Sequence, residues 1–221
     1  MTPKMTLVKN YFEIVYKRDG FANEIVTIFA AFLCRAVSCF PLMSASLARQ
    51  LVELQTNPTD GFAVRGLVDD NIFKWQVIIF GPPESPYEGG TFLAQLDFPI
   101  SYPQHPPKMR FITNILHPNV YRDGYVCISI LHPPGDGPHG VERAAERWQP
   151  VHTVESIVIS VQSMLSEPNF LSPANLEALL MFRINPQRYN ERVKQCVKES
   201  NVALENDYRD ISNDGEGRRA Q

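Results

Sequence analysis

The chain has 221 residues, of which 44% are hydrophobic and 20% charged, and these ordinary proportions exclude global disorder. Its net charge of −3 argues against a dedicated nucleic-acid-binding protein, which usually carries a basic excess. The four cysteines are scattered and form no CxxC pair, so neither a disulfide scaffold nor a metal site is expected.

The N-terminal segment, residues 1–43, differs from the rest of the chain. Basic residues precede an apolar run over residues 25–34, which Arg35 interrupts before a second run ends at Met43. The interruption counts against a transmembrane helix, which needs about 20 apolar residues. Acidic residues ahead of the run count against a cleaved signal peptide. We expect an atypical extension, with membrane contact through residues 25–43 as the alternative.

The next elements follow clear hydrophobic patterns. Helical spacing over Ser44–Gln55 predicts a first helix, ended by Asn57-Pro58. Four strand-like runs follow with short connectors, which indicates an antiparallel meander. These runs lie at 62–68, 73–80, 91–98 and 108–112. Residues 113–152 have neither period, and an irregular stretch of that length is usually functional.

The C-terminal part is predicted to be helical. An apolar stripe begins at Thr153, and Ser172-Pro173 and Asn185-Pro186 each resemble the N-cap and first residue of a further helix. After about Asn201 the chain becomes polar and mildly acidic, and we expect residues 201–221 to form a frayed tail. The sequence thus predicts an α+β fold: an N-terminal helix, a four-stranded antiparallel meander, an irregular stretch and C-terminal helices over residues 44–200.

The irregular stretch carries the candidate chemistry. His117-Pro-Asn119 is followed, after seven residues, by Cys127. Cys127 comes directly after a turn, so its thiol could be an accessible nucleophile. A His before Pro more often hydrogen-bonds structurally than acts as a base, whereas the Asn119 amide could stabilise an oxyanion. The spacing alone is not specific.

The residues around this site make it specific, because the sequence resembles the ubiquitin-conjugating enzymes. The matching pieces stand in family order between about Ser44 and Ser200. They are Tyr87-Glu-Gly-Gly-Thr-Phe92, Phe98-Pro99, Tyr102-Pro103, Pro106-Pro107, His117-Pro-Asn119, Cys127-Ile-Ser-Ile-Leu131, Trp148-x-Pro150, Glu167-Pro-Asn169 and Ser172-Pro-Ala-Asn175.

The resemblance implies a reaction and its partners. Cys127 would accept ubiquitin from an activating-enzyme thioester and pass it to a lysine amine, with a RING-type ligase holding both. Asn119 would be the oxyanion donor and His117 would support the site. ATP is used only upstream, so no cofactor is expected, and no phosphate-binding loop is found. The resemblance implies a cytoplasmic or nuclear protein, with the endoplasmic-reticulum membrane surface as an alternative.

The long connection after Cys127 is similar to that of one subgroup, which builds degradative chains with cullin–RING ligases or in endoplasmic-reticulum degradation. Asp136 and Glu142 match acidic positions of that loop, where a carboxylate could orient the acceptor amine. Ser172 also matches the subgroup. Gly137, however, replaces a second acidic residue.

Partner surfaces carry over by position. The ligase contacts would be Pro106, Trp148, Pro150 and Val151. Arg49 would contact the activating enzyme, as a lone basic residue on the first helix. Two other functions stay open: a non-catalytic variant of the same fold that binds ubiquitin or a ligase, and a cysteine hydrolase, for which no credible His–Asn or His–Asp partner set is visible.

Overall fold

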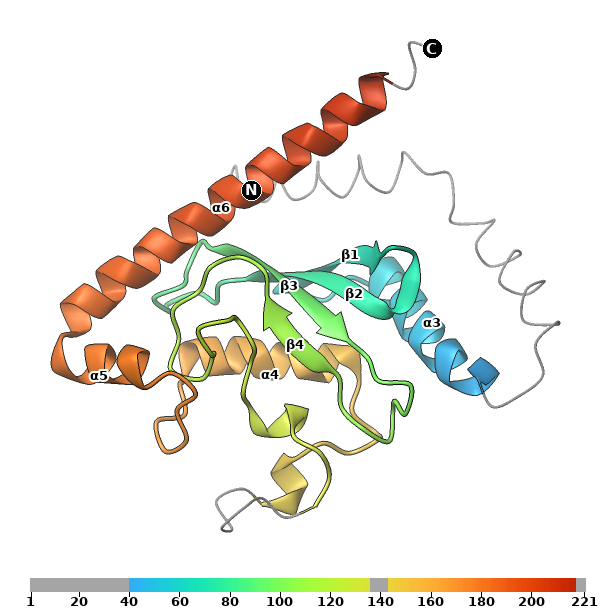
Figure 1. The fold of residues 1–221 in the computed structure, drawn as a ribbon, viewed down its shortest axis with the longest axis horizontal. Helices are drawn as coiled ribbons and strands as arrows, with labels where there is room; N and C mark the ends of the chain where they lie inside the picture. The colour runs from blue at the N-terminus through green and yellow to red at the C-terminus, as the bar shows by residue number, and fades with distance from the viewer. Residues whose placement is uncertain (1–39, 136–142, 218–221) are drawn as a thin grey trace. The chain divides into compact units, whose positions relative to one another are not determined.

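In this computed structural model, residues 40–135 and 143–217 are described, with side-chain environments for residues 45–135 and 143–209 (Figure 1). Residues Met43–Asp207 form one compact unit. The expected N-terminal extension therefore lies outside the described residues, apart from its last four. The helices and strands are α3 (Phe40–Thr56), β1 (Phe62–Val68), β2 (Asn71–Phe80), β3 (Thr91–Asp97), β4 (Lys108–Phe111), α4 (Val154–Ser166), α5 (Leu176–Ile184) and α6 (Pro186–Gly217), with short 3-10 turns η1 (Ser129–Leu131) and η3 (Ala144–Glu146).

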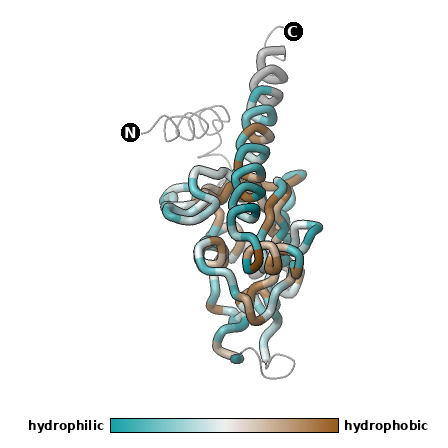
Figure 2. The backbone as a smooth tube through the Cα atoms, turned by 90° about the vertical axis from the view of Figure 1, so that its left-hand side faces the viewer, coloured by the Kyte–Doolittle hydropathy of each residue, from teal (hydrophilic) through white to brown (hydrophobic). Residues whose placement is uncertain are grey.

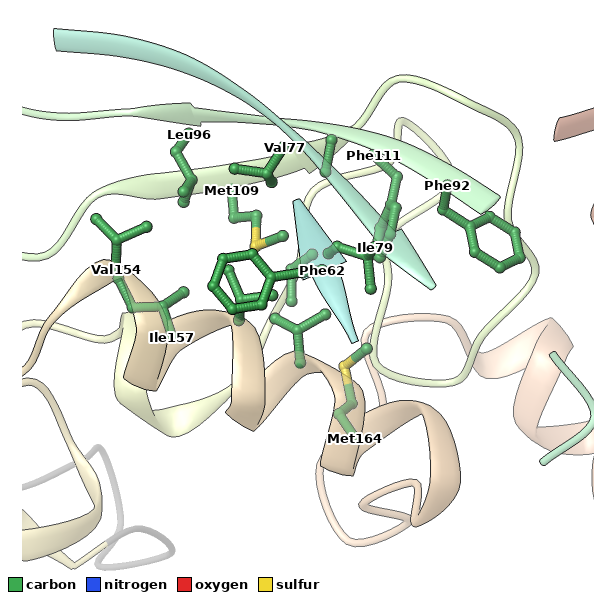
Figure 3. Close-up of a cluster of buried hydrophobic side chains, with 14 of the residues drawn as sticks. Phe62, Val77, Ile79, Phe92, Leu96, Met109, Phe111, Val154, Ile157 and Met164 are labelled. Carbon is green, nitrogen blue, oxygen red and sulfur yellow. The ribbon is translucent and has the colours of Figure 1, made fainter. Parts of the chain in front are cut away.

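The four strands form one antiparallel sheet in the order β1-β2-β3-β4, which confirms the predicted meander. Alternate residues of each strand point to one face, because the side-chain period of a strand is two. Figure 3 shows this inner face, where Val77, Ile79 and Met109 approach α4. The other face mixes polar residues such as Gln76 and Gln95 with the buried Ile78 and Leu93, whereas the larger apolar inner face needs a helical cover.

Helix α4 supplies that cover. Its buried residues follow the predicted stripe from Val154 to Leu165, and Figure 3 shows Ile157 and Met164 facing the sheet. The Thr153 side chain accepts a hydrogen bond from the Ser156 amide, while the Ser156 hydroxyl accepts one from the Thr153 amide, so a capping box starts the helix at the predicted residue.

Helix α3 begins four residues earlier than the predicted start at Ser44 and ends one residue later. Leu47 and Leu54 lie in the core, as the pattern predicts, but Gln50 is also buried. Its Nε2 donates to the Tyr102 hydroxyl over 3.1 Å, and its Oε1 accepts from the Val154 amide over 2.9 Å. One polar side chain thus joins α3, the loop between β3 and β4 that carries Tyr102, and the start of α4.

The predicted start of α5 is wrong. Ser172-Pro173 precedes α5 but does not cap it; the helix starts at Leu176, and the Asn175 side chain accepts the capping bond from the Ala178 amide. The second signature is confirmed, because Asn185 accepts from the Arg188 amide and Pro186 opens α6.

Helix α6 does not end near Asn201, where the sequence predicts fraying, but continues to Gly217. Figure 2 shows that most of this helix is hydrophilic. The Asn201 side chain accepts from the Thr91 amide over 2.9 Å and donates to the Gly89 carbonyl over 3.1 Å, and Asp207 pairs with Arg65 at 2.5 Å. These contacts to β1 and β3 explain why a polar sequence stays helical here. Within the described ranges, no helix is long and apolar enough to cross a membrane.

Candidate active site

A tight hairpin connects Asn119 to Cys127 and explains their spacing. Val120 and Val126 form an antiparallel bridge, and the Cys127 amide donates to the Asn119 carbonyl over 2.9 Å. Gly124 turns the chain with φ +92°, and a Cβ there would lie 2.4 Å from the Phe111 carbonyl oxygen. The seven intervening residues therefore bring the amide donor and the thiol residue opposite each other.

Asn119 is 1% exposed, and its side-chain amide binds a neighbouring loop. Its Oδ1 accepts from the Asn169 amide over 2.8 Å, and its Nδ2 donates to the Asn169 carbonyl over 2.7 Å and to the Ser172 carbonyl over 3.3 Å. In this geometry both amide hydrogens point to backbone oxygens. The Asn119 side-chain amide therefore holds the loop between α4 and α5 beside the hairpin.

His117 lies fully buried behind the hairpin. Its Nδ1 accepts from the Asn119 amide over 2.9 Å, and its Nε2 contacts the Met164 carbonyl at 3.0 Å, which requires the proton on Nε2. Burial lowers the pKa of His117 to about 4. A neutral imidazole with both nitrogens bound to backbone is a positioning group, not a base.

Cys127 lies at the end of the hairpin and is half-buried. The Tyr121 hydroxyl lies 3.8 Å from Sγ, and this hydrogen bond is the largest of the causes that raise the pKa of Tyr121. Nε2 of His132 lies 3.5 Å from Sγ. The sulfur thus faces a hydroxyl and an imidazole. By contrast, Cys196 is 3% exposed, and burial raises the pKa of its thiol.

His132 is the residue that the motif reasoning missed. The sequence pattern points only to His117 of the His-Pro-Asn motif, which lies behind the hairpin. In an extended strand, a residue five positions after Cys127 would be about 16 Å away. The η1 turn folds the chain back instead. The signal in the sequence was the spacing Cys-x4-His, which without this turn carries no information.

The remaining predicted site residues are distributed around the hairpin. Ser172 is exposed and takes part through its carbonyl. The exposed Arg122 of the hairpin turn forms an ion pair with Glu177 in the first turn of α5, a contact that contributes little to stability. Asp136 and Glu142 lie outside the described residues. In the described part of the chain, no group of three His, Cys, Asp or Glu side chains could hold a metal ion.

The predicted partner residues lie on two adjoining loops and on α3. Trp148 is fully buried, and its Nε1 donates to the Pro103 carbonyl over 2.7 Å, which joins the two loops. Pro150 is exposed and Val151 is 76% exposed, whereas Pro106 is half-buried. Trp148 therefore supports this surface from below. Arg49 is exposed on α3.

Comparison with known proteins identifies the family of the chain. The family model described as ubiquitin-conjugating enzyme matches residues 46–197, and the chain belongs to that family.

Similar relatives cover the same region. The probable ubiquitin-conjugating enzyme E2 7 of Caenorhabditis elegans is 56% identical over 158 residues, which are 71% of this chain and 96% of that protein. The human ubiquitin-conjugating enzyme E2 G2 is 47% identical over 154 residues, 70% of this chain and 93% of that protein. The solved structure of human ubiquitin-conjugating enzyme E2 G1 has 53% identity and a TM-score of 0.50, covering 57% of this chain and 95% of that chain.

Family membership establishes the type of reaction. The protein is an acyl transferase of the ubiquitin conjugation pathway, which accepts ubiquitin as a cysteine thioester and transfers it to amines. This decides against the cysteine hydrolase and against a purely binding variant. Its general partners are ubiquitin, an activating enzyme and a ligase.

Proposed function

We propose that Cys127 is the cysteine that carries ubiquitin. The observation that carries this proposal is its placement: a half-buried thiol at the end of a braced hairpin, with Tyr121 and His132 beside the sulfur. Cys196, the other cysteine in the described residues, is buried. A thioester is already activated, so the site mainly needs to orient the reactants and stabilise the oxyanion.

We propose that Asn119 is the oxyanion donor as well as the anchor of the loop after α4. The bond from Nδ2 to the Ser172 carbonyl, at 3.3 Å, is the longer of its two donated bonds. That hydrogen would be the one redirected to the oxyanion, while the bond to Asn169 holds the side chain in place. His117 would fix the hairpin backbone, and no cofactor would take part.

For the partners, we propose a RING-type ligase bound by Pro106, Pro150 and Val151 over the buried Trp148. The activating enzyme would contact Arg49 on α3. In the long loop, Asp136 and Glu142 would orient the acceptor lysine, with Ser172 beside it, in building degradative chains. Gln104, where an aromatic residue is common in the family, would weaken binding to the usual RING surface.

We also propose a division of the chain. Residues 44–200 would form the catalytic domain, followed by the polar, mildly acidic tail 201–221 and preceded by the atypical apolar extension 1–43. The working protein would act in the cytoplasm or nucleus, or at the endoplasmic-reticulum membrane surface if residues 25–43 contact the membrane.

A charging assay tests the role of Cys127. The full chain is incubated with activating enzyme, ATP and ubiquitin, and the products are separated on gels with and without thiol. We expect a ubiquitin-sized shift that thiol reverses, that Cys127→Ala abolishes and that Cys127→Ser converts into a slower, thiol-resistant oxyester. Cys196→Ala is the matched control and should charge normally. A thiol-sensitive shift that persists in Cys127→Ala would assign the thioester to another cysteine.

A further inference from the structure

The Cys127 sulfur lies beside two groups that can exchange or share a proton with it. Nε2 of His132 lies 3.5 Å from Sγ, and the Tyr121 hydroxyl lies 3.8 Å from it. Both distances are within the range of hydrogen bonds to sulfur. His132 is half-buried and follows the cysteine by five residues.

The backbone holds His132 at this distance. Its amide donates to the Ser129 carbonyl over 2.9 Å, which closes the η1 turn, and its carbonyl accepts from the Trp148 amide over 3.1 Å. Ile130 and Leu131 pack against the hydrophobic core, and the Trp148 side chain is fully buried. The imidazole is therefore presented by a short turn that is fixed at both ends, and groups that are positioned in advance act more effectively at a reacting atom.

We propose that His132 is a further catalytic residue, which takes the proton of the Cys127 thiol when the sulfur attacks the thioester of the activating enzyme. The proposal rests on the assignment of Cys127 as the ubiquitin-carrying cysteine. The buried His117 has no part in this step, because both of its ring nitrogens bind backbone groups.

The step balances as follows. The S–H bond breaks and an N–H bond forms at Nε2, while the sulfur forms a bond to the carbonyl carbon of the terminal glycine of ubiquitin. The bond between that carbon and the sulfur of the activating enzyme then breaks. The departing thiolate takes up the proton that the imidazolium releases. The Tyr121 hydroxyl can donate to the sulfur throughout, which supports the thiolate.

The size of the effect has an upper bound. A free thiol is about 3% ionised at pH 7, so complete ionisation would raise the thiolate population by no more than about thirtyfold. Proton transfer to the His132 imidazole should supply part of this gain. We therefore expect a 3- to 30-fold effect near pH 7 that disappears in alkali, where any thiol is ionised.

The direct test is the alkylation rate of Cys127 by iodoacetamide from pH 5.5 to pH 9.5. Peptide mass spectrometry separates Cys127 from Cys34, Cys39 and Cys196. His132→Gln, which keeps a hydrogen-bonding side chain but takes up no proton, should react 3- to 30-fold more slowly at pH 7 and at the wild-type rate above about pH 9. The titratable groups facing the sulfur include Tyr121, whose pKa the charge of Asp123 also raises, so Tyr121→Phe is measured in parallel.

The controls separate a chemical role from a structural one. His105→Gln changes an exposed histidine on another loop and should follow the wild-type profile. His132→Asn is the second variant, and circular dichroism verifies the fold of each. A ratio of wild-type to His132→Gln rates that is the same at every pH would overturn the proposal, as would equal rates at pH 7. If Cys127→Ala still charged, the assignment of the cysteine would fail instead, and the alkylation profile would still decide whether His132 ionises that thiol.

Discussion

Replacing Asn119 with Ala should lower the free energy of unfolding by about 2–3 kcal/mol. The amide makes three hydrogen bonds, two to Asn169 and one to the Ser172 carbonyl. A typical intramolecular hydrogen bond contributes about 1 kcal/mol net. Asn169 and Ser172 are exposed, so water can reach the backbone groups that lose their partner, and the larger penalty for stranded buried groups is avoided.

Urea unfolding followed by tryptophan fluorescence measures this loss, because Trp75 and Trp148 are both fully buried. The matched control is Asn169→Ala, an exposed asparagine on the same loop whose Oδ1 accepts only a local bond from the Leu171 amide. It should cost less than about 1 kcal/mol. An Asn119→Ala protein within 0.5 kcal/mol of wild type would refute the inference that this amide holds the loop.

The same variant separates anchoring from oxyanion stabilisation. Loss of an oxyanion donor should slow discharge to free lysine about 100- to 1,000-fold while charging continues. Loss of anchoring alone should slow charging and discharge to similar extents, since both use the same hairpin. Single-turnover rates for the two half-reactions, measured well below the unfolding temperature, distinguish these cases. Equal discharge rates for Asn119→Ala and wild type would remove the oxyanion assignment.

Three further predictions concern the framework. Burial lowers the pKa of His117 to about 4, so below about pH 6.5 the unfolded chain binds a proton that the folded chain does not. This residue should therefore lower the free energy of unfolding by about 2 kcal/mol between pH 7 and pH 5. Urea titrations of wild type and His117→Gln should differ in how steeply the free energy of unfolding falls with pH. Gln50→Leu deprives the Tyr102 hydroxyl of its partner and should cost about 1–3 kcal/mol in the same assay. A chain that ends before Asn201 should melt about 3–8 °C lower than one that ends after Asp207, and equal melting temperatures would contradict the bracing role of α6.

The elements that the sequence predicts well are those with a strong local period. The stripe on α4 and the alternation in β3 depend on neighbours in sequence, so the pattern places them to within a residue or two. The spacing of His-Pro-Asn and Cys127, interpreted through the family resemblance, also predicts a site in this stretch of chain, and that assignment stays a prediction. What carried that prediction was a combination of motifs, since a seven-residue spacing alone does not specify a hairpin.

The features that the sequence did not reveal depend on distant contacts. Gln50 fits the exposed face of an amphipathic helix, and its bonds to the Tyr102 hydroxyl and to the start of α4 explain its burial. Ser172 and Asn175 are both residue types that cap helices. In the structure Asn175 caps α5, and Ser172 lies in the preceding loop, where its carbonyl accepts a hydrogen bond from Asn119. The polar sequence after Asn201 predicts a frayed tail, because the contacts that hold it against the sheet are not visible in the sequence.

The hairpin places the two histidines in different environments. His117 is enclosed between the hairpin and the end of α4. Its buried ring stays neutral near pH 7 and holds the backbone through both nitrogens. His132 is half-buried beside the Cys127 sulfur, where an imidazole can exchange a proton with the thiol. If the imidazole at position 117 took up a proton on Nδ1, it would lose the hydrogen bond from the Asn119 amide that holds the hairpin. Separating the positioning imidazole from the one beside the sulfur therefore lets proton transfer occur without disturbing the geometry on which it depends.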